Sequence, residues 1–390
     1  MTVVGIVAEW NPFHNGHQHL LDVIRGEQPE AYIVSVMSGA FCQRGEVAAF
    51  DKWLRAEMAL AAGVDVVLEL PQVYASASLE GFARGGVASL WAFAPLDALY
   101  CGSESGDAAA LVAQAEYLRA HAEAFDRAMR RAGAEGMNYA QASQAFLAAA
   151  GFCSNRNTPN DRLALWYRMA LPEHVPMHLV RRTVAHDADE AQARMMSASA
   201  IRAHLPEHLD EVAFCLPQSS LRIMRRALAF GWRGADEEML LMTLRVLATS
   251  LEAGEVARRL AIRDGWTPRL LAAMREAESY DDLISRAQTR HYSRSRVRRL
   301  LLALLSPLPE MPQGPAYCRL LGASRRGRAL LKNRQGGAPL VVNVGRDQYL
   351  LDEGARALLL ADIHRQNLAD LLTGQPLGRD YREPPRFPNP

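Results

Sequence analysis

The pattern of apolar residues changes character about halfway along the chain. In the first half, short aliphatic and β-branched runs alternate with longer stretches whose apolar residues recur at helical spacing. Short, fully apolar runs are typical of strands that are buried on both faces of a sheet. The pattern therefore predicts a parallel sheet with helices on both faces, and ligands are expected beyond the carboxyl ends of its strands. The predicted strands span residues 3–8, 32–37, 64–70, 98–101 and 178–180.

From about Leu209 the strand signal fades and helical spacing dominates. The predicted helices of this half span residues 239–251, 255–262, 268–278, 297–305, 319–331 and 353–372, with a short strand at 341–344. An alanine-rich stretch at about residues 107–151 also lacks strand signals and predicts a helical insertion. We therefore expect an α/β domain over residues 1–205, followed by a mainly α-helical domain over residues 206–390.

Composition narrows the class of protein. The chain has 390 residues, is 49% hydrophobic and has a mean hydropathy of −0.11. It contains no uninterrupted apolar run near about 20 residues, so no membrane span is expected. The first residues lack the basic segment and cleavage site of a signal peptide, which predicts a cytoplasmic protein. The five cysteines are far apart and never form a C-x-x-C pair, which predicts reduced thiols without a disulfide partner.

Charge is balanced overall but not along the chain. Residues 1–205 carry 16 Lys and Arg against 22 Asp and Glu, a formal charge of −6, whereas the remaining residues carry 28 against 21, or +7. Such basic clusters either neutralise phosphates of a nucleic acid or form solvated helical faces. The excess gathers at Arg290, Arg294, Arg296, Arg298 and Arg299, and again at Arg325, Arg326, Arg328, Lys332 and Arg334.

Directly after the first predicted strand stands a His-x-Gly-His turn, His14 to His17, which leads into an amphipathic helix. The glycine lets the backbone approach a ligand, and the free N–H groups of a helix start favour an anion. Two imidazoles at this point are suited to donate hydrogen bonds to phosphate oxygens. The alternatives are ordinary turn histidines, or a metal site with His19, for which the nearby sequence offers no convincing further ligands.

A second polar element, Ser197-Ala-Ser-Ala-Ile-Arg202, stands at the predicted start of a later helix. Two hydroxyls followed by a guanidinium are suited to bind a triphosphate opposite the histidines. Taken alone, the same residues also fit an ordinary helix cap and first turn. The element becomes informative through its combination with the His-x-Gly-His turn.

Together, these two elements resemble those of the nucleotidyltransferase superfamily, which includes pantetheine-phosphate and nicotinamide-mononucleotide adenylyltransferases. The finer pattern is similar to that of the tRNA(Met) cytidine acetate ligase family, and this resemblance covers essentially the whole chain. The segments that carry it are residues 5–17, 36–46, 51–55, 67–71, 102–104, 158–161, 292–296 and 322–332.

The resemblance implies a Rossmann-like nucleotidyltransferase domain followed by a helical, tRNA-binding domain. It also implies an enzyme that uses ATP and Mg²⁺ to activate acetate as acetyl-adenylate, with release of pyrophosphate. The acetyl group would then pass to N4 of the wobble cytidine of elongator tRNA(Met). No acetyl-CoA and no metal site made by the protein are implied.

Carried over to this sequence, the resemblance implies three sets of residues. The catalytic set is His14, His17, Ser199 and Arg202. The ATP-binding set is Val7, Ala8, Glu9, Trp10, Asn11, Pro12, Phe13, His14, Asn15, Gly16, His17, Gln18, His19, Leu20, Gly102, Asn160, Ser197 and an arginine at Arg181 or Arg182. The tRNA-binding set is Arg44, Lys52, Arg290, Arg294, Arg296, Arg298 and Arg299.

Two further features leave alternatives open. Gln43, Arg44, Asp51, Lys52 and Arg55 form a polar cluster just beyond a strand end, which fits either a substrate-facing wall or a structural hydrogen-bond network. Glu69 stands in an apolar strand and needs a cationic partner such as Lys52. Two other functions also fit parts of the sequence: a small-molecule adenylyltransferase, and a non-catalytic RNA-binding protein on the same scaffold.

Overall fold

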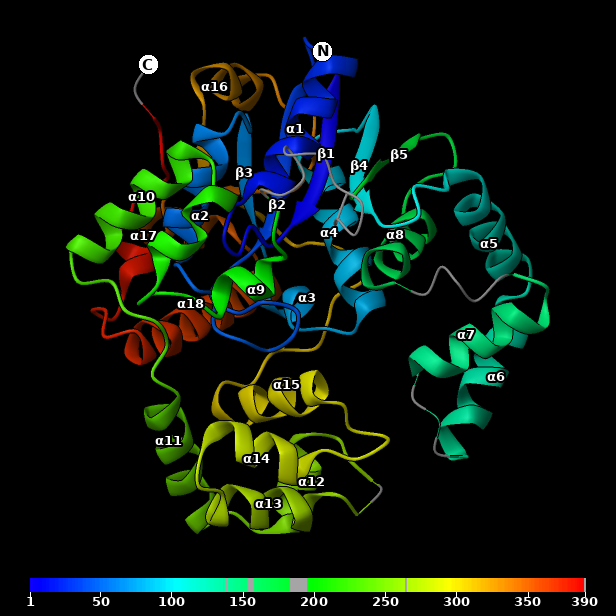
Figure 1. Cartoon of the computed structure of the whole chain (residues 1–390), viewed down its shortest axis with the longest axis vertical. Coiled ribbons are helices and arrows are strands. Elements are labelled where there is room, and N and C mark those ends of the chain that lie inside the picture. Colours follow the sequence, from blue (N-terminus) through cyan, green and yellow to red (C-terminus); the bar gives the residue numbers. More distant parts are fainter. Residues whose placement is uncertain (136, 138, 153–157, 183–194, 264, 389–390) are drawn as a thin grey trace.

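The computed structural model describes the whole chain except residues 136, 138, 153–157, 183–194, 264 and 389–390. Its centre is a sheet with the strand order β5-β4-β1-β2-β3-β6-β7 (Figure 1). The strands are β1 (Val3–Ala8), β2 (Tyr32–Ser38), β3 (Val66–Leu70), β4 (Ala98–Ser103), β5 (Met177–Arg181), β6 (Cys318–Ala323) and β7 (Leu340–Val341). Strands β1 to β5 are parallel to one another, so the five predicted strands and the parallel sheet are confirmed.

Alternate residues of the strands enter two hydrophobic clusters, one on each face of the sheet. Val3 and Val7 of β1 belong to one cluster, and Val4 and Ile6 belong to the other. The first face is covered by α4 (Leu79–Phe93), α8 (Pro159–Ala170) and α18 (Glu353–Leu372), and the second by α1 (Asn15–Glu27), α2 (Lys52–Ala61) and α10 (Gln218–Ala229). Burial on both faces explains why the central strands are mainly apolar.

Two helical units project from this α/β body (Figure 1). The residues of the predicted insertion form α5 (Ala108–Ala120), α6 (Ala122–Ala134) and α7 (Tyr139–Ala149). The second unit, here called the helical unit, has a hydrophobic core of its own and lies beyond the carboxyl ends of the central strands. It consists of α11 (Glu237–Ser250), α12 (Ala253–Arg259), α13 (Thr267–Glu276), α14 (Tyr280–Ala287) and α15 (Arg294–Leu305).

The helix predicted over residues 319–331 is wrong in its first part. Residues Cys318–Ala323 form β6, which pairs antiparallel with β3, and α16 (Arg325–Lys332) begins only after it. Packing against residues distant in the sequence favours the strand. Leu320 is buried on one face of the sheet and Leu321 on the other, as successive residues of a strand are. The strand predicted at 341–344 is shorter, because α17 (Val344–Asp347) follows β7 at once. The second half of the chain therefore supplies both the helical unit and one edge of the sheet.

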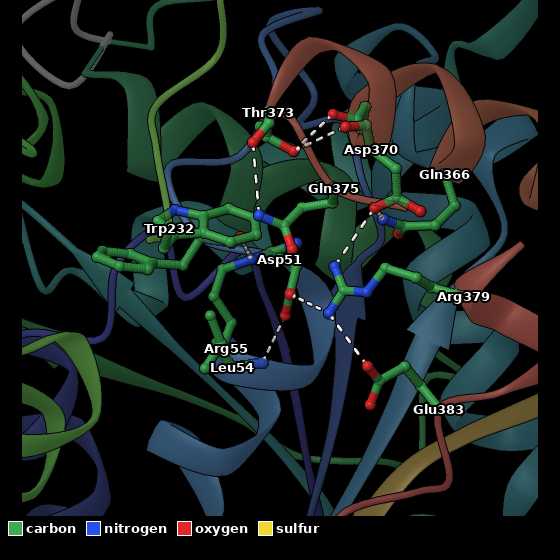
Figure 2. A network of polar contacts seen from close by, with 12 residues as sticks. Asp51, Leu54, Arg55, Trp232, Gln366, Asp370, Thr373, Gln375, Arg379 and Glu383 are labelled. Carbon is green, nitrogen blue, oxygen red and sulfur yellow. Dashed lines mark hydrogen bonds and ion pairs between the residues drawn. The ribbon is translucent and has the colours of Figure 1, made fainter. Parts of the chain in front are cut away.

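The C-terminal segment is fastened to the α/β body by buried ion pairs (Figure 2). Arg379 of η4 (Arg379–Tyr381) pairs with Asp51 at 2.6 Å and with Asp370 of α18 at 3.3 Å. Asp51 also caps α2 by accepting a hydrogen bond from the Leu54 N–H at 2.8 Å. Removing either partner would leave a buried charge without compensation, so this network fixes the end of the chain against α2.

The remaining short elements connect these parts. They are α3 (Gln72–Ala75), α9 (Ala198–Arg202), η2 (Leu209–Cys215) and η3 (Gln348–Leu350). Within the described residues, no helix is both long and apolar enough to cross a membrane. Four of the five cysteines, Cys42, Cys101, Cys215 and Cys318, are buried free thiols, and Cys153 lies outside the described residues.

Candidate functional site

A cavity of about 480 Å³ lies beyond the carboxyl ends of β1 and β4. This is where a parallel sheet is expected to bind a ligand. Most of the predicted ATP-binding and catalytic residues line it: Val7, Ala8, Glu9, Trp10, Asn11, His14, Gly16, His17, His19, Leu20, Gly102, Asn160, Arg181, Arg182, Ser197, Ser199 and Arg202. Pro12, Phe13, Asn15 and Gln18 do not line it. Of these four, Phe13 packs in the core, and Asn15 and Gln18 bond to Phe214 and Asp22.

A backbone N–H group fixes the tautomer of each histidine in the turn. His14 caps α1, and its Nδ1 accepts a hydrogen bond from the Gly16 N–H at 3.0 Å. His17 Nδ1 in turn accepts from the His14 N–H at 3.3 Å. A neutral imidazole has one donor and one acceptor nitrogen, so these contacts assign the proton of each ring to Nε2. His14 Nε2 is buried and has no hydrogen-bond partner among the described residues, which makes it a free donor in the wall of the cavity.

The electrostatic surroundings keep both rings neutral. Burial lowers the pKa of His14 to about 3, and the positive charges of Arg182 and Arg202 contribute to the shift. Burial also lowers the pKa of His17 well below its ordinary value, with contributions from His14 and Arg182. The rings stack with centroids 3.8 Å apart, and Trp10 presents an edge-on contact to His17. At neutral pH the pair therefore acts through N–H donation, and positive charge in the cavity comes from the arginines.

The parent protein is expected to lose more stability on acidification than a His14→Asn variant loses. The folded-state pKa of His14 is about 3, whereas its ordinary value is 6.5. Between these values the unfolded state binds a proton that the folded state does not, so stability is lost as pH falls below about 6.5. The expected difference in slope is about 1 kcal/mol per pH unit, measured by urea unfolding between about pH 5 and pH 7. Equal slopes would contradict a neutral, buried His14.

The late serine-arginine element meets the histidine turn in space. Ser197 caps α9 through the Ala200 N–H, and its Oγ lies 3.0 Å from that of Ser199. Arg202, at the end of α9, donates from Nη1 to the Asn11 carbonyl at 2.9 Å. Two elements that are far apart in the sequence are thus joined by a direct hydrogen bond at one end of the cavity.

Comparison with known proteins agrees with this geometry. A family model described as HIGH Nucleotidyl Transferase matches residues 1–382. The tRNA(Met) cytidine acetate ligase of Caldanaerobacter subterraneus is 31% identical over 384 residues, which cover 93% of this chain and 95% of the relative. That of Syntrophotalea carbinolica is 36% identical, covering 89% and 86%. The chain belongs to the tRNA(Met) cytidine acetate ligase family, within the HIGH nucleotidyltransferases.

A solved structure of this family has the same architecture. Thermotoga maritima TmcAL, crystallised with alpha-thio ATP, superimposes with a TM-score of 0.86 at 28% sequence identity and covers 99% of both chains. The same protein without ligand gives a TM-score of 0.87 at 29% identity. The resemblance stated from the motifs is therefore confirmed, as is the nucleotidyltransferase fold.

The cavity is also lined by residues from β4, α8 and β5, of which the sequence pattern identified only some. Asn160 Nδ2 donates to Glu104 Oε1 at 2.5 Å, and Glu104 itself lines the cavity. Both Arg181 and Arg182 also line it, so the structure does not choose between them. Gly102 allows Arg182 to lie close, because a Cβ there would come within 3.2 Å of the arginine side chain. Glu104 could have been found from the sequence, since it is the polar residue that directly follows Gly102 and Ser103 at the end of β4.

Some residues of the polar cluster beyond β2 line the cavity, and others form a buried structural network. Arg44 is exposed and lines the cavity together with Gln43. Lys52 is fully buried, and its ammonium group lies 2.8 Å from Glu69 and 2.8 Å from Asp380. The prediction that Lys52 contacts tRNA is therefore wrong, because the cation needed by Glu69 in its strand is Lys52 itself. Arg55 is likewise buried, and its guanidinium donates to the carbonyls of Glu9, Ser38, Gly39 and Phe50.

The arginine cluster on the helical unit does not form one uniform face. Arg290 and Arg296 are exposed, and Arg294 pairs with Asp281 near the surface. Arg298 and Arg299 turn towards the α/β body, where they contact Glu46 and the Gln43 carbonyl. Burial, then the nearby charge of Arg296, lowers the pKa of Arg299 to about 10. The five arginines of this cluster therefore separate into three that face outward and two that bridge to residues lining the cavity.

Proposed function

We propose that this protein is an ATP-dependent ligase that acetylates N4 of the wobble cytidine of elongator tRNA(Met), with acetyl-adenylate as the intermediate. The observation that carries the proposal is the convergence of the His-x-Gly-His turn and the Ser197–Arg202 element on one cavity, in a member of the tRNA(Met) cytidine acetate ligase family. The relatives' name supplies tRNA(Met) and acetate as substrates, and the T. maritima structure holds an ATP analogue.

In the first step, an acetate oxygen attacks the α-phosphorus of ATP. The new oxygen–phosphorus bond gives acetyl-adenylate, and the bond to the β-phosphate breaks to release pyrophosphate. Catalysis of such a displacement consists mainly of positioning and charge stabilisation. We assign donation to the phosphate oxygens to His14 Nε2 and His17 Nε2, and charge neutralisation to Arg202 with an arginine at 181 or 182. Ser197 and Ser199 stand at the same end of the cavity and are suited to bind the outer phosphates.

Mg²⁺ is proposed to enter with ATP as part of the substrate. The ion prefers oxygen ligands and commonly takes most of them from phosphates and water. Within the described ranges, no group of three or more His, Cys, Asp or Glu side chains could hold an ion by itself. Glu9 and Glu46 line the cavity and are suited to hold waters of the ion's shell. The ion would neutralise the charge that develops on pyrophosphate.

In the second step, the cytosine N4 amine attacks the acetyl carbonyl carbon, and AMP leaves with the bonding electrons of the anhydride. The attacking amine loses a proton to the surroundings. AMP is already a good leaving group, so alignment of the base with the mixed anhydride contributes more than a strong base would. No general base is assigned for this reason.

The purified protein is expected to convert ATP to AMP and pyrophosphate when acetate and tRNA(Met) are present. Nucleoside mass spectrometry of the recovered tRNA should then detect N4-acetylcytidine. AMP formation without modified RNA would retain the adenylation chemistry and reject the acceptor. A coenzyme-type dinucleotide formed without RNA would instead identify a small-molecule adenylyltransferase, and ATP binding without any turnover would identify a non-catalytic protein.

Replacing the three outward arginines, Arg290, Arg294 and Arg296, by alanine is expected to weaken tRNA binding and make it less dependent on salt. Removing one phosphate-binding side chain should reduce the slope of log K against log salt by about 0.7 to 0.9, so the slope of the triple variant should fall by about 2 to 3. The measurement is tRNA binding at several salt concentrations. An unchanged slope would identify these arginines as ordinary solvated surface.

A further inference from the structure

A short loop separates the cavity from the helical unit. This 41–47 loop is closed by a bridge between Phe41 and Val47 and by a hydrogen bond from the Cys42 N–H to the Glu46 carbonyl at 2.9 Å. Its Gln43, Arg44 and Glu46 line the cavity on one side. On the other side it lies directly against α15.

The contact between the loop and α15 is too close for any other residue than glycine at position 45. Gly45 has a φ of +77°, and a Cβ there would come within 2.8 Å of the Arg299 backbone nitrogen. Arg299 also donates to the Gln43 carbonyl at 3.1 Å. The position of the loop, and with it one wall of the cavity, is thus set by the helical unit.

Glu46 is shared between two arginines, one from each part of the molecule. Its Oε1 pairs with Arg298 of α15 at 2.5 Å, and its Oε2 lies 3.4 Å from Nη2 of Arg202 in the cavity. All three side chains are largely buried, with exposed fractions of 18% for Arg298, 22% for Arg202 and 30% for Glu46. Arg202 is also held by the Asn11 carbonyl at 2.9 Å, so its position does not depend on Glu46 alone.

We infer that Arg298 is a positioning residue for the nucleotide site: by holding Glu46, it keeps that carboxylate from pairing fully with Arg202, which stays free for ATP phosphates. The inference rests on the proposed function, since it takes Arg202 as a phosphate-binding group. The two arginines compete for one carboxylate, and the shorter distance favours Arg298. Without Arg298, Glu46 would have Arg202 as its cationic partner, and ATP would have to displace it.

A second carboxylate, that of Glu237, would also favour movement of Glu46 towards Arg202 if Arg298 were removed. Glu237, at the start of α11, has its pKa raised by burial; the positive charge of Arg298 lowers it again, and the negative charges of Asp281 and Glu46 raise it. Removal of Arg298 would therefore leave Glu46 and Glu237 to repel each other across the interface. Repulsion by Glu237 moves Glu46 away from the helical unit and towards Arg202.

The test measures acetate-dependent ATP–pyrophosphate exchange and ATP binding by calorimetry, both without RNA. Arg298→Ala is expected to raise the KM and the Kd for ATP by about five-fold, with kcat changed less than about two-fold. Adding Glu46→Gln to Arg298→Ala should return both constants to within about two-fold of Glu46→Gln alone, because the competing charge is gone. Arg259→Ala, which breaks an exposed ion pair on α12 of the same unit, is the control and should change neither constant.

Three outcomes would overturn the inference. If Arg298→Ala binds ATP as the parent does but binds tRNA more weakly, Arg298 is an RNA contact. If it lowers kcat and thermal stability without raising KM, or if Glu46→Gln fails to suppress its effect, it only fastens the interface. A parent without acetate-dependent exchange would instead reject the proposed function, and the Kd for ATP in the same variants would still decide the role of Arg298.

Discussion

Replacing His14 by alanine is expected to slow the formation of acetyl-adenylate by about 100-fold or more. The Nε2–H of His14 is a buried donor without a partner among the described residues, and its tautomer is fixed by the Gly16 N–H. Loss of one preorganised donor to a transition-state oxyanion typically costs a factor of about 100 to 1,000. His17→Ala should have an effect of the same order, because its Nδ1 is also occupied. Acetate-dependent ATP–pyrophosphate exchange measures both.

The control must separate this role from helix capping, since His14 also caps α1. His14→Asn provides it, because asparagine is among the best N-cap residues. We expect the asparagine variant to unfold at nearly the parent's denaturant concentration while its exchange rate remains far below that of the parent. Exchange at the parent rate in His14→Ala would remove the imidazole from the mechanism.

The hydrophobic pattern predicted those strands and helices that are determined by residues close together in the sequence. Each strand from β1 to β5 is a short apolar run bounded by polar residues, and α18 was predicted with its observed bounds. The pattern failed at β6, where Arg319 interrupts the run and an arginine-rich segment follows. In the structure Arg319 is buried beside Asp380, which lies 61 residues further on. When the partner of a charged residue lies so far away in the sequence, the local pattern gives no sign of it, and the residue is predicted to lie at the surface.

The same distinction applies to the site. The capping contacts of the histidine turn join residues two or three positions apart, and a motif that short could be interpreted directly. The roles of Lys52 and Arg298 could not, because their partners Asp380 and Glu46 lie 328 and 252 residues away. Both were predicted to contact tRNA, since an isolated basic residue fits a phosphate as well as it fits an unseen carboxylate.

Replacing Lys52 by methionine is expected to lower the free energy of unfolding by about 3 to 5 kcal/mol, the usual cost of removing one partner from a buried ion pair. The ammonium group donates to both oxygens of Glu69 and to Asp380 at 2.8 to 2.9 Å. Burial alone would lower the pKa of Lys52, but the charges of Asp380 and Glu69 raise it above its ordinary value. Without this cation, two buried carboxylates are left with Arg319, which lies 3.3 Å from Asp380.

Urea unfolding of Lys52→Met measures the loss, and Lys332→Met is the matched control, because Lys332 is exposed and is the only other lysine in the chain. The loss should also depend on pH in a defined direction. Burial already raises the pKa of Glu69 in the folded parent, and loss of the Lys52 charge, which opposes this shift, raises it further. The folded variant then binds protons that the unfolded chain does not, so its stability rises as pH falls, and the difference from the parent should shrink between about pH 7 and pH 5. A difference below about 1 kcal/mol at neutral pH, or one that grows with acidification, would show that Lys52 does not carry the charge balance of this core.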